Sequence, residues 1–222
     1  MERPRAVIFD LDYTLAVSRQ DRTTILDDAV EAANAPPLTR DQYLEAHSQH
    51  LTRETREPIF ADLLSEYETD ADPDVLARAY RQEIADALEA LPGVEAMLAD
   101  LRGSYRIGLL TNGPVVAQRD KLEQLGWEDL FDAALVTGEL EAGKPDPRAF
   151  EAIAAALAID PADAVYVGDD VNADIYGATN AGMDAIQVLL EDGPDPDPRA
   201  IAYVPQNEIA TTLPELIADL ES

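Results

Sequence analysis

The sequence predicts an α/β protein with a doubly wound parallel sheet and an inserted helical domain. Short apolar runs typical of buried parallel strands, such as 6–9 (AVIF) and 164–167 (AVYV), alternate with segments of helical periodicity. Strands and helices that alternate in this way form a parallel sheet with helices on both faces. In addition, the long stretch between the first and second predicted strands is helical in pattern throughout.

The strands and helices of the sheet domain are expected in a regular order. We expect strands at 6–9, 105–110, 133–136, 164–167, 185–190 and 202–204. We expect helices at 94–101, 114–125, 147–157, 173–181 and 213–220. Gly126 and Gly182 follow two of these helices directly, which is where glycine commonly ends a helix.

Residues 17–90 are predicted to form a separate helical cap domain, and 1–16 with 91–222 the α/β core. Asp72 and Pro73 supply an N-cap carboxylate and a first-turn proline for one cap helix. The segment 91–93 (LPG) interrupts the helical pattern and so marks the return to the core.

The composition is strongly acidic. Asp and Glu number 45 against 16 Lys and Arg, a formal net charge of −29. Such a chain repels nucleic acid and anionic lipid, and no basic cluster offers an exception, so we expect neither as a partner. Acid richness with only two lysines, Lys121 and Lys144, favours a halophilic protein from a salt-rich cytoplasm; an ordinary acidic protein is the alternative.

The expected location is cytoplasmic. The chain has no uncharged apolar run of roughly 18 residues, so we expect no membrane span. Residues 1–4 lead directly into a predicted strand and leave no room for a signal peptide. The lack of cysteine excludes disulfides, iron–sulfur clusters and thiolate zinc sites. The sequence leaves the oligomeric state open.

Polar side chains follow four of the predicted strands at their carboxyl ends, where ligands bind in open α/β sheets. In strand order they are Asp10 and Asp12, then Thr111 and Asn112, then Lys144, and finally Asp169, Asp170 and Asp174.

These side chains together suit the chemistry of a phosphate ester. Carboxylates that meet at one sheet edge repel one another unless a cation lies among them, and Mg²⁺ is the natural one because it prefers oxygen ligands. The lack of nearby His or Cys disfavours zinc. Lys144 and Thr111 offer a positive charge and a hydroxyl donor to phosphate oxygens. One carboxylate could attack phosphorus while a second acts as general acid and base.

The four strand ends resemble the motifs of the haloacid dehalogenase superfamily of phosphohydrolases, in the same order. The matching segments are 10–14 (DLDYT), Thr111 with 112–113 (NG), Lys144 within 143–147 (GKPDP), and 168–169 (GD) with Asp174. Their order and spacing cover nearly the whole chain. The insertion at 17–90 matches the helical cap that many members carry, and the resemblance implies a Rossmann-like core.

The resemblance also implies a role for each residue. Asp10 would be the nucleophile and an Mg²⁺ ligand, and Asp12 the general acid and base, whose backbone carbonyl also binds Mg²⁺. Thr111, Asn112 and Lys144 would hold the phosphoryl group. Asp169 would be a direct metal ligand, and Asp174 or else Asp170 would support the water shell of the metal.

The leading hypothesis is therefore an Mg²⁺-dependent phosphatase that acts through an aspartyl-phosphate on a small metabolite: a sugar phosphate, phosphoglycolate or a nucleoside monophosphate. A phosphomutase is the nearest alternative. A 2-haloacid dehalogenase is disfavoured because those members lack the acid at Asp12. A phosphoacceptor signalling domain is more remote, since its acceptor follows a later strand and it has no long helical insertion.

Three further features of the sequence are expected to be secondary. His47 and His50 lie on a predicted cap helix, where a solvated or half-buried face is expected rather than a metal pair. Tyr13, where many family members carry glycine, is expected to narrow the pocket or stack on substrate. Most of the cap arginines are expected to be surface ion-pair partners, namely Arg19, Arg22, Arg53 and Arg56.

Overall fold

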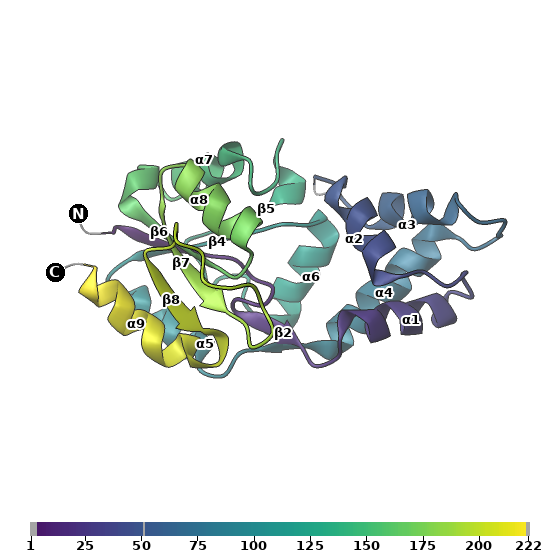
Figure 1. The fold of residues 1–222 in the computed structure, drawn as a ribbon, viewed down its shortest axis with the longest axis horizontal. Helices are drawn as coiled ribbons and strands as arrows, with labels where there is room; N and C mark the ends of the chain where they lie inside the picture. The colour runs from purple at the N-terminus through teal and green to yellow at the C-terminus, as the bar shows by residue number, and fades with distance from the viewer. Residues whose placement is uncertain (1–3, 51, 221–222) are drawn as a thin grey trace.

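The computed structural model describes residues 4–50 and 52–220. It contains an α/β core and a helical insertion, which extend to opposite ends of the molecule in Figure 1. The core sheet has six parallel strands in the order β5-β4-β1-β6-β7-β8. Their bounds are β1 Ala6–Phe9, β4 Arg106–Thr111, β5 Ala133–Val136, β6 Ala164–Gly168, β7 Asp184–Leu189 and β8 Ala202–Pro205. The predicted doubly wound sheet is thus confirmed.

Helices cover both faces of this sheet, because the side chains of β1 alternate between two apolar cores. Val7 and Phe9 face one core together with helices α5 (Val94–Leu101), α6 (Val115–Leu125) and α9 (Ile209–Asp219). Ala6 and Ile8 face the other core with helices α7 (Pro147–Ala156) and α8 (Gly177–Asn180). The central strand β1 is therefore fully buried, and its carboxyl end carries Asp10.

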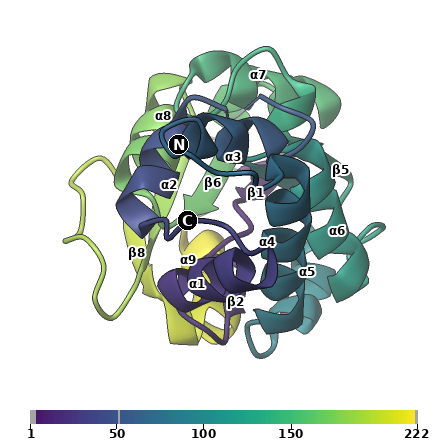
Figure 2. The same ribbon diagram turned by 90° about the vertical axis from the view of Figure 1, so that its right-hand side faces the viewer.

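The insertion is helical, as predicted, and has an apolar core of its own. It consists of α1 Arg22–Ala32, α2 Arg40–Ser48, α3 Glu57–Leu64 and α4 Pro73–Ala87. Asp72 accepts a hydrogen bond at the start of α4, and Pro73 occupies its first turn. Figure 2 views the molecule from the side of these four helices. The division of the chain into a core of 1–16 and 91–222 and a cap of 17–90 remains a prediction.

Two features were not expected from the sequence. Strands β2 (Ala16–Ser18) and β3 (Leu88–Ala90) pair antiparallel where the chain enters and leaves the insertion. They are too short to give a periodic pattern. The expected helix 173–181 is instead a π-helix, η3 (Val171–Tyr176), followed by α8.

Short 3₁₀ segments complete the described structure: η1 Thr137–Glu139, η2 Pro161–Asp163 and η4 Gln206–Glu208. Within residues 4–50 and 52–220, the helices are all too short or too polar to cross a membrane.

Candidate active site

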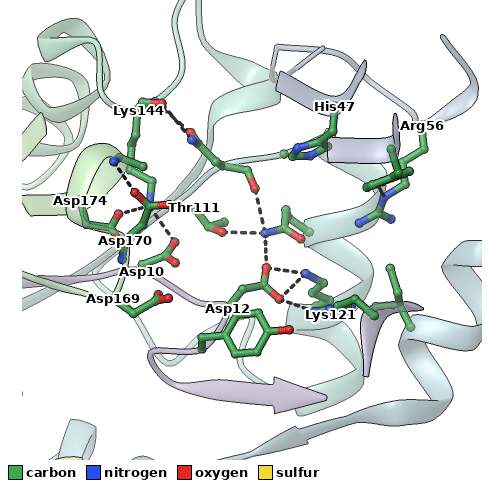
Figure 3. A pocket seen from close by; sticks show the side chains of 18 of the residues that line it. Asp10, Asp12, His47, Arg56, Thr111, Lys121, Lys144, Asp169, Asp170 and Asp174 are labelled. Carbon is green, nitrogen blue, oxygen red and sulfur yellow. Dashed lines mark hydrogen bonds and ion pairs between the residues drawn. The ribbon is translucent and has the colours of Figure 1, made fainter. Parts of the chain in front are cut away.

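The carboxyl ends of β1, β4 and β6 meet the helical insertion at a cavity of about 290 Å³. Its core side is lined by the residues that follow these strands, and its other side by residues of α1, α2, α4 and the segment before α3. Figure 3 shows the two sides facing each other. The predicted convergence of the strand-end residues is therefore present in the structure, although their chemical roles remain predictions.

Lys144 lies at the centre of the core side. Its buried ammonium donates hydrogen bonds to Asp10 Oδ1 at 2.8 Å, Asp174 Oδ1 at 2.7 Å and Tyr166 Oη at 2.9 Å. The Tyr166 hydroxyl in turn donates to the carbonyl oxygen of Leu110. Burial alone would lower the pKa of Lys144, but the two carboxylates outweigh it and hold that pKa well above its usual value. Lys144 is therefore a permanent cation at this position.

Three carboxylates surround this part of the cavity. Asp10, Asp169 and Asp174 each offer an oxygen, and these oxygens lie within 4.8 Å of one another. Burial, followed by the charges of the neighbouring carboxylates, raises the pKa of Asp169. Burial also raises the pKa of Asp10, although Lys144 opposes it. One ammonium does not balance three carboxylates, so the cluster fits a hard divalent cation with oxygen ligands.

A glycine makes room for Asp174 in this cluster. A Cβ added to Gly168 would lie 2.5 Å from Asp174 Cγ and 2.7 Å from its Cβ. Asp174 Oδ2 also accepts a hydrogen bond from the backbone N–H of Asp170 at 3.0 Å. The Asp170 carboxylate instead caps η3 by accepting from the N–H groups of Asn172 and Ala173. Of the two aspartates left open by the sequence, Asp174 is the one in the acidic cluster.

The carboxylate of Asp12 points away from this cluster, toward the insertion. It accepts hydrogen bonds from Lys121 Nζ at 2.7 Å, Arg22 Nη2 at 3.1 Å and Gln118 Nε2 at 3.0 Å. Burial acts to raise the pKa of Asp12, but Lys121 and Arg22 outweigh it and hold that pKa far below its usual value. The predicted contact between its backbone carbonyl and a metal remains a prediction.

Thr111 and Asn112 both line the cavity. The hydroxyl of Thr111 accepts a hydrogen bond from Gln118 Nε2 at 2.6 Å. The Asn112 side chain makes two hydrogen bonds with the backbone of Lys144: its Oδ1 accepts from N–H at 2.9 Å and its Nδ2 donates to the carbonyl at 3.0 Å. Asn112 therefore fixes the loop that carries Lys144, and its predicted contact with substrate remains a prediction.

The insertion contributes cations that sequence reasoning placed on the surface. That expectation is wrong for Arg56, which is 8% exposed, and for Arg22, whose side chain is 12% exposed. Both line the cavity, as does Arg40, for which no role was predicted. Arg19 does pair with an acid, at 3.9 Å from Glu89. The arginines missed here come from helical segments whose placement over the core no local pattern shows.

Lys121 was also missed, although a signal for it existed. The chain has only two lysines, and the other is Lys144. A lysine kept where arginine is otherwise preferred indicates a site that needs a compact ammonium. That argument applies to Lys121 as well, and its side chain is buried against Asp12.

His47 lines the cavity and stacks on Tyr43, with ring centres 5.7 Å apart. His50 instead contacts Asp62 at 2.6 Å. The metal-competent cluster found among the described residues contains neither histidine. Tyr13, with φ +61°, adopts the left-handed conformation that glycine adopts most readily, and its ring lies under Arg22 in the cavity wall.

Comparison with known proteins gives consistent matches. Residues 4–182 match the haloacid dehalogenase-like hydrolase family. The chain is 31% identical over 216 residues to the glyceraldehyde 3-phosphate phosphatase of Methanopyrus kandleri. This match covers 92% of each protein. It is 41% identical over 100 residues to the human N-acylneuraminate-9-phosphatase, a match that spans 45% of this chain and 40% of that protein.

Solved structures share the fold. The HAD-hydrolase YfnB of Bacillus subtilis, solved with bound magnesium, has a TM-score of 0.72 to this chain at 22% sequence identity. The superposition covers 98% of this chain and all of the other. The core and the helical insertion are therefore both present in that protein.

Proposed function

Because the chain belongs to the haloacid dehalogenase-like hydrolase family of enzymes, we propose that it is an Mg²⁺-dependent phosphatase of a small phosphorylated metabolite. One observation carries the proposal: Lys144 joins Asp10 to Asp174 at the cluster that also includes Asp169, at the floor of a cavity. The two relatives named above are phosphatases of small phosphorylated compounds. A cavity of about 290 Å³ is at the lower end for ligand sites, which supports a small substrate.

Asp10 and Asp169 would hold the metal directly, together with the Asp12 carbonyl. Asp174 would support the water shell of the metal. Bound there, Mg²⁺ would neutralise the carboxylates and the charge of the phosphoryl oxygens. The acidic cluster supports this assignment, because burial and mutual repulsion raise the pKa of Asp10 and Asp169 and so favour an added cation.

In the proposed first step, a carboxylate oxygen of Asp10 attacks phosphorus and the bond from phosphorus to the ester oxygen breaks. Asp12 takes up a proton as the negative charge of the bound ester raises its pKa, and it gives this proton to the departing oxygen, so that an alcohol leaves and an aspartyl-phosphate remains on Asp10. Lys144 and Thr111 hold the phosphoryl oxygens during the transfer.

In the second step, Asp12, which lost its proton in the first, takes one from water. The resulting oxygen attacks phosphorus, the bond from phosphorus to Asp10 breaks, and inorganic phosphate is released. Lys121 and Arg22 hold the pKa of Asp12 low and so favour its ionised form, which is the form that can accept this proton. Its presence in the cavity also favours ester hydrolysis over dehalogenation, since a halide leaves without a proton.

The test is a panel of phosphate esters assayed for phosphate release, with and without Mg²⁺, in molar KCl. We expect release that requires Mg²⁺ and that Asp10→Asn abolishes. The matched control is Asp160→Asn: this residue lies outside the cavity and caps η2, and asparagine also serves as an N-cap. Turnover retained in Asp10→Asn would contradict the mechanism. An isomerised product with little free phosphate would favour a phosphomutase. Halide release without Mg²⁺ from a 2-haloacid assayed alongside the esters would favour a dehalogenase.

A further inference from the structure

The side of the cavity formed by the insertion is rich in cations. Arg22, Arg40 and Arg56 line it, and Lys121 faces it from helix α6 of the core. Figure 3 shows His47, Arg56 and Lys121 across the cavity from the cluster of Asp10, Asp169 and Asp174. In a chain of net charge −29, this concentration of positive charge needs a physical reason.

Two of these cations are balanced within the protein. Arg22 and Lys121 both pair with the Asp12 carboxylate, at 3.1 Å and 2.7 Å. Arg40 and Arg56 are different, because neither has an ion pair with any of the acidic residues in 4–50 and 52–220. Their positive charge is therefore not compensated in the described protein.

Neutral aromatic groups hold these two guanidinium groups in place. Arg56 Nε donates to Tyr43 Oη at 3.1 Å, and its guanidinium carbon lies 5.5 Å from the ring centre of Tyr80. Arg40 Nη1 donates to Tyr80 Oη at 3.3 Å, and its guanidinium carbon lies 5.1 Å from the ring centre of Tyr43. Burial, the largest cause, raises the pKa of Tyr80 to about 12, so its hydroxyl stays uncharged. The two arginines are thus oriented without being neutralised.

Burial distinguishes these arginines from the others that have no acidic partner. Arg53 and Arg106 also have none among the described residues, but both are exposed to solvent. Arg56 is buried and Arg40 is partly buried. A buried charge without a partner costs free energy, and this chain has 45 acidic residues from which a partner could come. An anion from outside the protein explains both the burial and the missing partner.

We propose that Arg40 and Arg56 form a subsite for a second anionic group of the substrate, a carboxylate or a second phosphate. The inference rests on the proposed phosphatase function: the ester phosphate lies at Asp10 and Lys144, and the second anion lies at the insertion side of the same cavity. Arginine suits this role because its planar donors match carboxylate and phosphate oxygens. A cavity of about 290 Å³ favours a short ester, in which few bonds separate the two anions.

The test compares esters that differ only in the second anion. One pair is 2-phosphoglycolate and 2-hydroxyethyl phosphate; the other is propane-1,3-diol bisphosphate and its monophosphate. We expect the wild type to prefer the member that carries the second anionic group by about ten- to hundredfold in kcat/KM, as for hydrogen bonds to charged groups. The pair with the larger preference identifies the second anion as carboxylate or phosphate.

Arg40→Gln and Arg56→Gln should each reduce this preference by about tenfold, mainly through KM. Turnover of the ester without the second anionic group should stay nearly unchanged. Arg53→Gln is the matched control, an exposed insertion arginine outside the cavity, and should keep the wild-type preference. Thermal unfolding shows whether each variant is folded. If loss of the buried Arg56 unfolds the insertion, Arg40→Gln alone tests the subsite. Equal wild-type kcat/KM for both members of each pair would overturn the subsite. So would an equal loss of kcat/KM on both members in the arginine variants.

Binding measurements separate this inference from the proposed function. Calorimetry with Asp10→Asn measures the affinity for each member of a pair without turnover. Tighter binding of the ester with the second anionic group that depends on Arg40 and Arg56, with no hydrolysis by the wild type, would support the subsite and contradict the phosphatase. Hydrolysis with no such preference in rate or binding would contradict the subsite and leave the phosphatase standing.

Discussion

The Lys121 ammonium contacts both oxygens of the Asp12 carboxylate and lies 2.7 Å from Oδ1. Lys121 belongs to helix α6 of the core, whereas Arg22, which contacts the same carboxylate, begins helix α1 of the insertion. The proposed general acid and base is therefore kept ionised by one cation from each part of the molecule. Burial lowers the pKa of Lys121 to about 8 despite Asp12, so Lys121 carries its charge at neutral pH.

Replacing this lysine should alter the pH dependence of turnover. In Lys121→Met, Asp12 loses its main stabilising charge, so the Asp12 pKa rises toward its ordinary value. Because Asp12 must be ionised to take a proton from water, the acid limb of kcat should move to higher pH. We also expect kcat to fall by about tenfold or more, since general acid–base groups contribute about 10²–10⁴-fold. Steady-state kinetics across pH would measure both effects.

Two further variants make this prediction specific. Lys121→Arg keeps a cation beside Asp12, so the acid limb of its kcat profile should lie much closer to that of the wild type than the limb of Lys121→Met does. Arg119→Met, on the same helix but paired with Glu139 on the surface, should leave the pH profile unchanged. An unchanged acid limb in Lys121→Met would show that Lys121 does not set the pKa of Asp12.

The sequence was informative where chemistry follows directly from strand order. Asp10, Lys144 and Asp169 follow strands whose carboxyl ends lie at one edge of the sheet, and Thr111 is the last residue of such a strand. Parallel strands force such residues together whatever the details of packing, so their convergence could be predicted.

The insertion side of the cavity could not be predicted in this way. Arg40 and Arg56 reach the cavity only because the insertion lies over the core, and no periodicity within the insertion shows how it docks. The choice between Asp170 and Asp174 also needed the structure, in which Asp170 caps η3 and Asp174 contacts Lys144. Periodicity in the sequence indicates which residues share one face of a helix, but not which part of the protein that face packs against.

The acidic cluster should make the stability of the protein depend on Mg²⁺. At a concentration of about one hundred times Kd, binding stabilises a protein by about 2.7 kcal/mol, or about 5–10 °C in melting temperature at this size. We expect such a rise for the wild type and its loss on chelation. Asp169→Asn should lose most of the rise. Without metal the same variant should melt higher than the wild type, because it removes one of three repelling carboxylates.

Asp170→Asn is the control for this measurement. Its side chain caps η3, which an asparagine oxygen also does, and it lies outside the metal-competent cluster found in the described structure. This variant should keep the response to Mg²⁺. An equal response in Asp169→Asn and the wild type would contradict the assignment of Asp169 as a metal ligand.

His47 should contribute to the loss of stability in mild acid. Burial, then Arg56 and Arg40, lowers the pKa of His47 to about 4, whereas an unfolded histidine titrates near 6.5. Between these values the unfolded chain binds a proton that the folded chain does not. The contribution of His47 to stability is therefore fully present above about pH 6.5. It falls as the pH drops toward 4, by on the order of 2 kcal/mol after allowance for partial exposure.

Urea unfolding of His47→Gln across this pH range would measure the contribution. The variant should show a shallower fall than the wild type, because glutamine does not titrate. His50→Gln, which removes the other of the two histidines, should retain the part of the fall that belongs to His47. Parallel curves for His47→Gln and the wild type would contradict the lowered pKa.

The net charge of −29 predicts that salt stabilises the fold. Like charges crowd together on folding, and their repulsion is screened as the Debye length falls from about 10 Å at 0.1 M salt to about 3 Å at 1 M. We expect the melting temperature to rise by roughly 5 °C or more over this range, and partial unfolding when salt is withdrawn. Sucrose of equal osmolality screens no charge, so it should not reproduce the rise in melting temperature that KCl produces. A melting temperature independent of KCl would leave the acidic composition without the proposed halophilic role. The chemistry proposed at Asp10 and Lys144 would stand, because these two residues are in direct contact at 2.8 Å and do not depend on the surface charge.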